Sequence, residues 1–99
     1  MRLSNFDREV IRRTTAEVAG ADARAMLFGS RTQADRRGGD IDLLIELPRP
    51  CADRLALGLR LGARLDQQLG LQKIDILVVD AATPDSPLLQ AARGQAVPV

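Results

Sequence analysis

Three of the aspartates stand at positions from which their carboxylates could hold divalent metal ions together. Asp40 and Asp42 open an apolar run with one isoleucine between them, and Asp75 sits between two isoleucines later in the chain. Side chains alternate between the two faces of a strand, so Asp40 and Asp42 share a face, and Asp75 points away from the apolar face of its own strand. Two such carboxylates repel each other unless a cation lies between them. Because carboxylate oxygens suit Mg²⁺, the pattern predicts phosphoryl transfer with two ions about 4 Å apart and with Asp75 as the base for an attacking hydroxyl.

A turn at Gly29-Ser30 precedes the first acidic pair and has the composition of a phosphate-binding turn. Glycine lets the backbone approach phosphate oxygens closely, and neighbouring N–H groups together with the Ser30 hydroxyl can donate to them. Arg31, Arg36 and Arg37 follow. They would add positive charge beside a triphosphate, although a solvated loop explains them equally well. The turn and the acids, in this order, predict a nucleotidyl transfer site.

The composition excludes several other classes of protein. With 99 residues the chain is expected to form one domain over 1–99, and without histidine it cannot build a zinc hydrolase site or a histidine-based triad. A net charge of +1 argues against nucleic acid as a partner, and a single cysteine, Cys51, rules out an internal disulfide. The first residues form no apolar signal and no stretch is long enough to cross a bilayer, so we expect no membrane association and a cytoplasmic location.

Helical and strand periodicities alternate along the chain. They predict, in order, a helix over 4–20, strands over 23–28 and 41–47, a helix over 53–68, a strand over 73–79, a helix over 86–94 and a weak edge strand over 97–99. The order α-β-β-α-β-α predicts an α/β (α+β) fold, a small mixed sheet covered by helices on one face. The short link between the first two strands makes them antiparallel, and strand 74–79 is expected to be central.

The helix over 53–68 carries leucines on most of its sides. The predicted buried face contains Leu55, Leu59 and Leu65, with small residues that would let the helix approach the sheet closely. Leu57 and Leu61 lie beside that face. They are either peripheral core or an apolar strip for a partner or a second copy of the chain.

Three segments resemble the minimal nucleotidyltransferases of the DNA polymerase β-like superfamily. They are Leu27-Phe28-Gly29-Ser30-Arg31, Gly39-Asp40-Ile41-Asp42-Leu43-Leu44-Ile45 and Ile74-Asp75-Ile76-Leu77-Val78-Val79. The resemblance implies the nucleotidyltransferase fold and Mg²⁺-dependent transfer of AMP from ATP. It implies that Gly29 and Ser30 bind the triphosphate, that Asp40 and Asp42 are metal ligands, and that Asp75 is the third acid. Of the three arginines, Arg31 is the best candidate for a phosphate contact. Many such proteins are antitoxins, encoded beside a helical HEPN-type ribonuclease toxin that they bind and can adenylylate on a hydroxyl.

Alternative functions remain open at this point. The loop departs from the family's usual pattern at Ala34 or Asp35 and at Gly39. A non-catalytic antitoxin that neutralises a HEPN-type toxin by occlusion is therefore the main alternative to an enzyme. A nucleotidyltransferase acting on a small molecule or an RNA end is a third option. A chain this short has no second domain to enclose the acceptor, so we expect a partner to complete the site in a homo- or hetero-oligomer.

Overall fold

The computed structural model describes residues 4–28, 40–70 and 73–99, and for Asp40 it describes the backbone alone. The elements follow in the order α1 (Asn5–Ala19), β1 (Arg24–Leu27), β2 (Asp40–Glu46), α2 (Arg54–Leu69), β3 (Lys73–Val79), α3 (Pro87–Gln95) and β4 (Val97–Pro98). The predicted order is confirmed, with ends that agree to within about one residue. No helix in these ranges is long and apolar enough to cross a membrane.

Each helix begins at a side-chain cap that can be read from the sequence. Ser4, Asp53 and Ser86 each accept a hydrogen bond from a backbone N–H three residues further on, at 3.0, 3.0 and 3.1 Å. Gly20 and Gly70 end α1 and α2 with φ values of 107° and 80°, in the region that favours glycine. Capping hydrogen bonds and glycine conformations, which involve residues close in the sequence, therefore fix where the helices begin and where α1 and α2 end.

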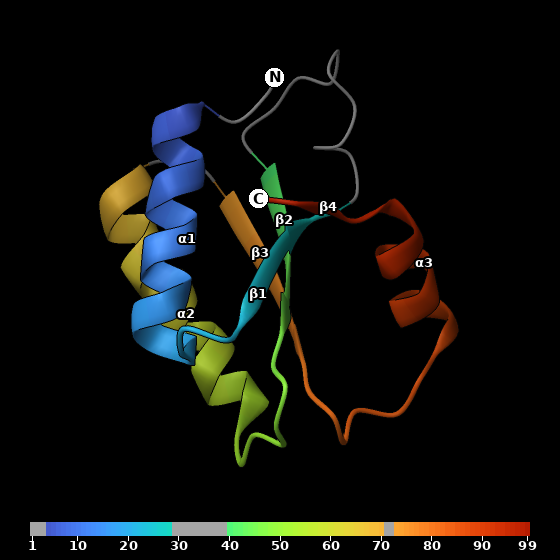
Figure 1. Ribbon diagram of the computed structural model, residues 1–99. Coiled ribbons are helices and arrows are strands. Elements are labelled where there is room, and N and C mark those ends of the chain that lie inside the picture. The colour runs from blue at the N-terminus through green and yellow to red at the C-terminus, as the bar shows by residue number, and fades with distance from the viewer. Residues whose placement is uncertain (1–3, 29–39, 71–72) are drawn as a thin grey trace.

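The strands form one sheet in the order β3-β2-β1-β4 (Figure 1). β1 pairs antiparallel with β2, as predicted, and also with β4, whereas β2 and β3 are parallel and are joined through α2. The prediction that 74–79 is the central strand is wrong, because β3 lies at the edge and β2 lies inside. Burial explains the difference. Leu43 and Leu44 of β2 point to opposite faces and both are 0% exposed, which requires cover on both sides of that strand.

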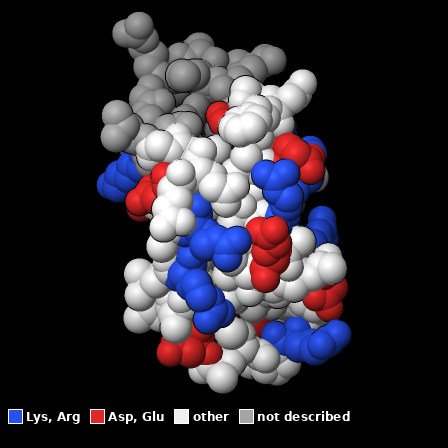
Figure 2. Space-filling model, turned by 90° about the vertical axis from the view of Figure 1, so that its left-hand side faces the viewer, with Lys and Arg blue, Asp and Glu red and all other residues white. Residues whose placement is uncertain are grey.

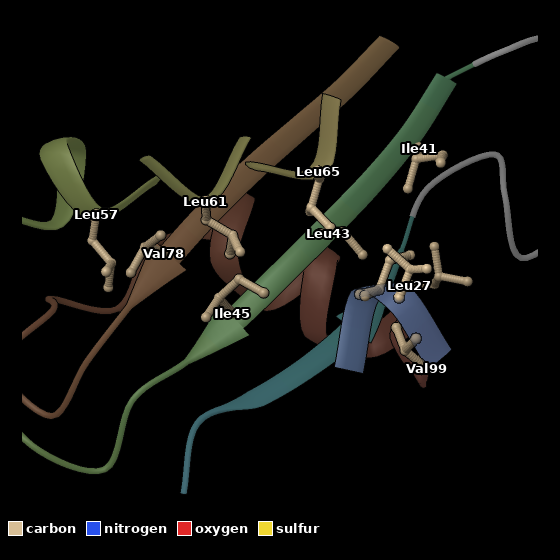
Figure 3. Close-up of a cluster of buried hydrophobic side chains, with 11 residues drawn as sticks. Leu27, Ile41, Leu43, Ile45, Leu57, Leu61, Leu65, Val78 and Val99 are labelled. Carbon is tan, nitrogen blue, oxygen red and sulfur yellow. The ribbon is translucent and has the colours of Figure 1, made fainter. Parts of the chain in front are cut away.

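α1 and α2 cover one face of the sheet and form the main core with it (Figure 1). Figure 3 shows Leu43 and Ile45 of β2 near Leu61 and Leu65 of α2, and Leu57 near Val78 of β3. Ile41 belongs to the same buried cluster. Val99, at the other end of the chain, is also buried in this cluster. The core therefore joins both ends of the sequence to the central strand.

The buried face of α2 differs from the predicted one. Leu57 and Leu61 are 6% and 0% exposed, while Leu55 and Leu59 are 75% and 67% exposed; Leu65 is buried, as predicted. Leucines recur at every second position in the first half of the helix, so their period alone leaves the buried side undetermined. α1 decides it, because α2 packs against α1 as well as against the sheet, and its buried side turns toward both.

The other face of the sheet is partly covered by α3, so the expectation of helices on one face only is wrong (Figure 1). Leu44, Val79 and Leu89 form a second buried cluster between the sheet and this helix. Arg93 of α3 also pairs with Glu46 of β2 at 3.2 Å. α3 therefore packs on the part of this face that is apolar.

Asp80 ties the end of β3 to the loop that enters α2. Its carboxylate accepts hydrogen bonds from the N–H of Cys51 at 2.7 Å, the N–H of Ala82 at 2.9 Å and the hydroxyl of Thr83 at 3.0 Å. The Arg54 guanidinium lies 4.0 Å away, and the Asp80 side chain is 3% exposed. The Cys51 N–H is the largest cause of a pKa of Asp80 below its ordinary value, against the opposing effect of burial.

Replacing a leucine on the observed buried side of α2 should be costly. We expect Leu61→Ala to lower the free energy of unfolding by about 2–5 kcal/mol, because it leaves a cavity between α2 and β2. Leu88→Ala makes the same deletion at a side chain that is 69% exposed, and it should change stability by about 0.5 kcal/mol or less. Urea denaturation followed by circular dichroism measures both. Equal losses in the two variants would contradict the observed packing.

Asp80 should make stability depend on pH in acid. Its pKa is lower in the folded than in the unfolded chain, so its contribution is present above the unfolded value near 3.8 and is lost as the pH falls through the folded pKa. We expect Asp80→Asn to be less stable than wild type at neutral pH and to lose less stability between about pH 5 and pH 2. Thermal melts across this range test the expectation. An acid-induced loss as steep as that of the wild type would contradict it.

Candidate active site

Asp42 and Asp75 lie side by side on the sheet. The parallel pairing of β2 with β3 sets them opposite each other in register, and residues so paired project from the same face. Neighbouring strands are about 4.8 Å apart, which brings both carboxylates within reach of one cation. Asp42 is half-buried and Asp75 is exposed.

The adjoining register pair joins Asp40, the first residue of β2, to Lys73, the first residue of β3. Strand alternation assigns these two positions to the same face as Asp42 and Asp75. Lys73 is exposed, and the sequence analysis did not single it out. Its spacing of two residues from Asp75 was the signal that could have identified it, because residues two apart share a strand face.

The residue that follows β1 is hydrogen-bonded to β2 at Asp42. The N–H of Phe28 donates to the carbonyl oxygen of Asp42 at 3.0 Å, and Phe28 directly precedes Gly29 in the sequence. The predicted nucleotide-binding residues Gly29, Ser30 and Arg31 lie outside the described residues, as do the other arginines of that loop. The chain therefore enters the predicted phosphate-binding segment beside Asp42.

The acids stand next to an apolar surface. Leu44 and Leu77 follow them by one strand period and are paired in register. Leu44 is buried, and Leu77 and Phe28 pack against the cluster under α3. Asp42 and Asp75 therefore mark the border on this face between the apolar part, on which α3 packs, and the acidic part.

Asp42 and Asp75 fit a hard divalent cation such as Mg²⁺, which takes carboxylate oxygens as ligands. In the described part of the chain no group of three or more histidine, cysteine, aspartate or glutamate side chains is placed to hold a metal. Of the three predicted ligands, the structure describes the side chains of Asp42 and Asp75. The side chain of the third predicted ligand, Asp40, is outside that part.

Two carboxyl groups whose pKa is lowered, Asp80 and Asp85, stabilise the fold. The pKa of Asp85 is lowered chiefly by a hydrogen bond from the Gln90 side chain at 2.9 Å. Asp85 also accepts a bond from the N–H of Ser86 at 3.0 Å. Both acids lie in the segment between β3 and α3 and hold that connection in place.

The helical side of the molecule carries charges of both signs close together. Figure 2 shows basic and acidic side chains interspersed on this side. Arg64 of α2 pairs with Glu17 of α1 at 3.0 Å, and Arg12 pairs with Glu9 at 3.3 Å. Nucleic-acid binding depends on clustered positive charge that neutralises phosphates, and such mixing disfavours it.

Comparison with solved structures identifies the architecture. A chain from the complex of tri-AMPylated Shewanella oneidensis HEPN toxin with MNT antitoxin aligns at a TM-score of 0.62 and 20% identity, over 97% of this chain and 71% of that one. A protein provisionally described as a minimal nucleotidyltransferase aligns at a TM-score of 0.63 and 24% identity, over 93% and 88% of the two chains. The chain has the minimal nucleotidyltransferase fold.

The fold predicted from the three sequence segments is thus confirmed. No protein-family model matches the sequence, and no curated protein matches it. At these identities the likeness extends to the minimal nucleotidyltransferase architecture and leaves the chemistry of the site to be argued from Asp42 and Asp75 themselves.

Mg²⁺ should stabilise the protein through these two acids. We expect Mg²⁺ to raise the unfolding temperature of the wild type, by the equivalent of about 1.4 kcal/mol when its concentration is ten times the dissociation constant. The rise should disappear in Asp42→Asn and in Asp75→Asn. Asp66→Asn, which removes an exposed carboxylate of α2, should keep it. Equal Mg²⁺ effects in all of these proteins would contradict a site at Asp42 and Asp75.

Proposed function

We propose that this protein is a nucleotidyltransferase that transfers AMP from ATP to a hydroxyl group of a partner protein and requires Mg²⁺. The observation that carries the proposal is the register pair of Asp42 and Asp75. The hydrogen bond from Phe28 supports it, because it starts the Gly29-Ser30 segment at the same place. Two carboxylates and a phosphate-binding turn are the parts that phosphoryl transfer needs.

Each residue has a role in this proposal. Asp40, Asp42 and Asp75 would hold Mg²⁺, which when bound stabilises the charge on the reacting phosphate oxygens. Gly29 and Ser30 would bind the triphosphate through N–H groups and the hydroxyl. Arg31 would add a charge-assisted contact to the phosphates. These roles match the carboxylate, glycine and arginine chemistry of the three sequence segments.

The transfer step balances without any further reactant. The acceptor oxygen bonds to the α-phosphorus of ATP, the bond from that phosphorus to the bridging oxygen breaks, and pyrophosphate leaves. Asp75 takes the proton of the acceptor hydroxyl. Its exposure suits this role, because an acceptor on another molecule has to reach it.

The acceptor class follows from the partner that we propose. One structural neighbour comes from a complex in which a HEPN toxin carries three AMP groups and is bound with an MNT antitoxin. By analogy, we assign this chain as the antitoxin of such a pair, acting in the cytoplasm on a HEPN-type toxin.

A non-catalytic antitoxin is the second candidate. The exposed Leu55 and Leu59 favour it, because an apolar surface can bind a partner without any chemistry. Under this alternative the aspartates would be dispensable for neutralisation, so the two candidates make opposite predictions for the same variants.

Labelling with ATP that carries a radioactive α-phosphate tests the proposal. The protein that co-purifies with the tagged chain should incorporate label in the presence of Mg²⁺. Asp75→Asn should reduce the rate by at least the roughly 10²–10⁴-fold that a general base contributes, because it removes a Mg²⁺ ligand as well. Asp42→Asn should abolish the reaction, and Asp66→Asn should retain it.

Two results would contradict the proposal, each in a different way. If the wild type labels no co-purifying protein, the proposed transferase activity is wrong. If Asp42→Asn relieves toxicity as fully as the wild type in cells that express the toxin, occlusion explains neutralisation.

A further inference from the structure

Among the described residues, the outer edge of β3 has no strand paired with it. β3 pairs with β2 on one side, and no described segment pairs with its other side. The charges of β3 are confined to its start, at Lys73 and Asp75, and the residues from Ile76 to Val79 have neither charge nor proline. An unpaired apolar edge readily recruits another strand, and charges usually interrupt such an edge. The second half of β3 lacks that interruption.

The apolar surface continues from the edge of β3 onto the outer side of α2, and we call this surface the α2–β3 strip. A groove of about 760 Å³ runs between α2 and β3, with Leu55, Leu59 and Gly62 among its lining residues. Leu55 and Leu59 are 75% and 67% exposed. A Cβ atom on Gly58 would lie 3.4 Å from Val78, and one on Gly62 would lie 3.6 Å from Ile76, so α2 runs antiparallel to β3 with its small residues toward the strand.

The dimensions of the strip suit an interface. β3 has seven residues and α2 has sixteen, which correspond to about 23 Å of strand and about 24 Å of helix. The strand and the helix are therefore of matching length. Strand and helix could therefore both contribute over their whole lengths.

The charged residues at the two ends of α2 have opposite signs, so the groove is complementary to a second copy that is turned end for end. Arg54, which also lies beside Asp80, stands at one end of α2, and Asp66 lies toward the other end. The α2 side of the groove therefore has a cation at one end and an anion at the other. A second copy that pairs antiparallel through β3 turns the groove end for end, so the Arg54 end of each copy meets the Asp66 end of the other.

We propose that the α2–β3 strip is the interface of a twofold-symmetric dimer of this chain. The β3 strands pair antiparallel and join two sheets into one. The α2 helices lie antiparallel beside each other, and the contact covers the exposed Leu55 and Leu59 of each copy. Because the twofold axis is perpendicular to the sheet, both Asp75 side chains lie on the same face of the joined sheet. This inference does not rest on the proposed transferase activity.

In the proposed dimer, the contact between copies is made by other leucines of α2 than those predicted from the sequence. Leu57 and Leu61, the first candidates for a contact between copies, are in the core. Leu55 and Leu59 take that role, because they are the α2 leucines left outside by the packing of α1.

Sedimentation equilibrium of the purified chain without ATP or toxin tests the dimer. The wild type should have twice the 10.7 kDa mass of the chain. Leu59→Glu should be a monomer with an unchanged circular dichroism spectrum. Leu88→Glu, at an α3 side chain that is 69% exposed, is the matched control and should remain a dimer.

Hydrogen exchange on the wild type gives a readout that does not depend on the folding of a variant. In a dimer all amides of β3 should be protected, because both edges are paired. In a monomer alternate amides of β3 should exchange quickly, since only those bonded to β2 are protected.

Several results would overturn the inference. A wild type that stays monomeric up to its limit of solubility would do so, as would a dimer that survives Leu59→Glu or one that Leu88→Glu also dissociates. If the chain alone is a monomer and Leu59→Glu weakens its binding to the toxin, the strip belongs to that partner and the homodimer is wrong.

Discussion

The burial of β2 on both faces is the constraint on which the fold and the site depend. Ile41, Leu43 and Ile45 fill the space under α1 and α2, while Leu44 faces the cluster under α3. A shift of one residue between β2 and β3 would turn one set of side chains to the wrong face. It would carry Asp75 into the apolar layer beneath α2, where an unpaired carboxylate is strongly disfavoured. The packing of the core thus enforces the register that places Asp42 opposite Asp75.

The face of β2 that is turned away from α1 and α2 has an apolar part, on which α3 packs, and an acidic part. Leu44 and Glu46 hold α3, through the apolar cluster and through the pair with Arg93. Asp42, earlier on the strand, lies beyond that cluster and meets Asp75 across the ladder. Asp80, at the far end of β3, anchors the strand to the loop before α2. Asp75 is therefore carried by a strand that is anchored at its other end, which favours a fixed geometry for any bound cation.

Much of this arrangement could be predicted from the sequence, for physical reasons that differ between elements. Ser4, Asp53 and Ser86 are caps that act over three residues, so the helix starts follow from the sequence. The face shared by Asp40 and Asp42 follows from strand alternation alone. The edge position of β3 could not be predicted, because strand order depends on which strand is buried on both sides. The buried side of α2 was missed for a related reason, since α1 selects Leu57 and Leu61 over Leu55 and Leu59. Asp80 was missed because its partners come from a distant loop.

The central claim is that Asp42 and Asp75 form one cation site at the place where the chain enters the Gly29-Ser30 segment. The most direct measurement is the anomalous scattering of Mn²⁺, used in place of Mg²⁺, in crystals grown with a non-hydrolysable ATP analogue. The account predicts an anomalous peak bonded to carboxylate oxygens of both aspartates, at about 2.0–2.2 Å, with the phosphates of the analogue beside it. A bound analogue with no peak between Asp42 and Asp75, or with its phosphates on another face of the sheet, would contradict the account.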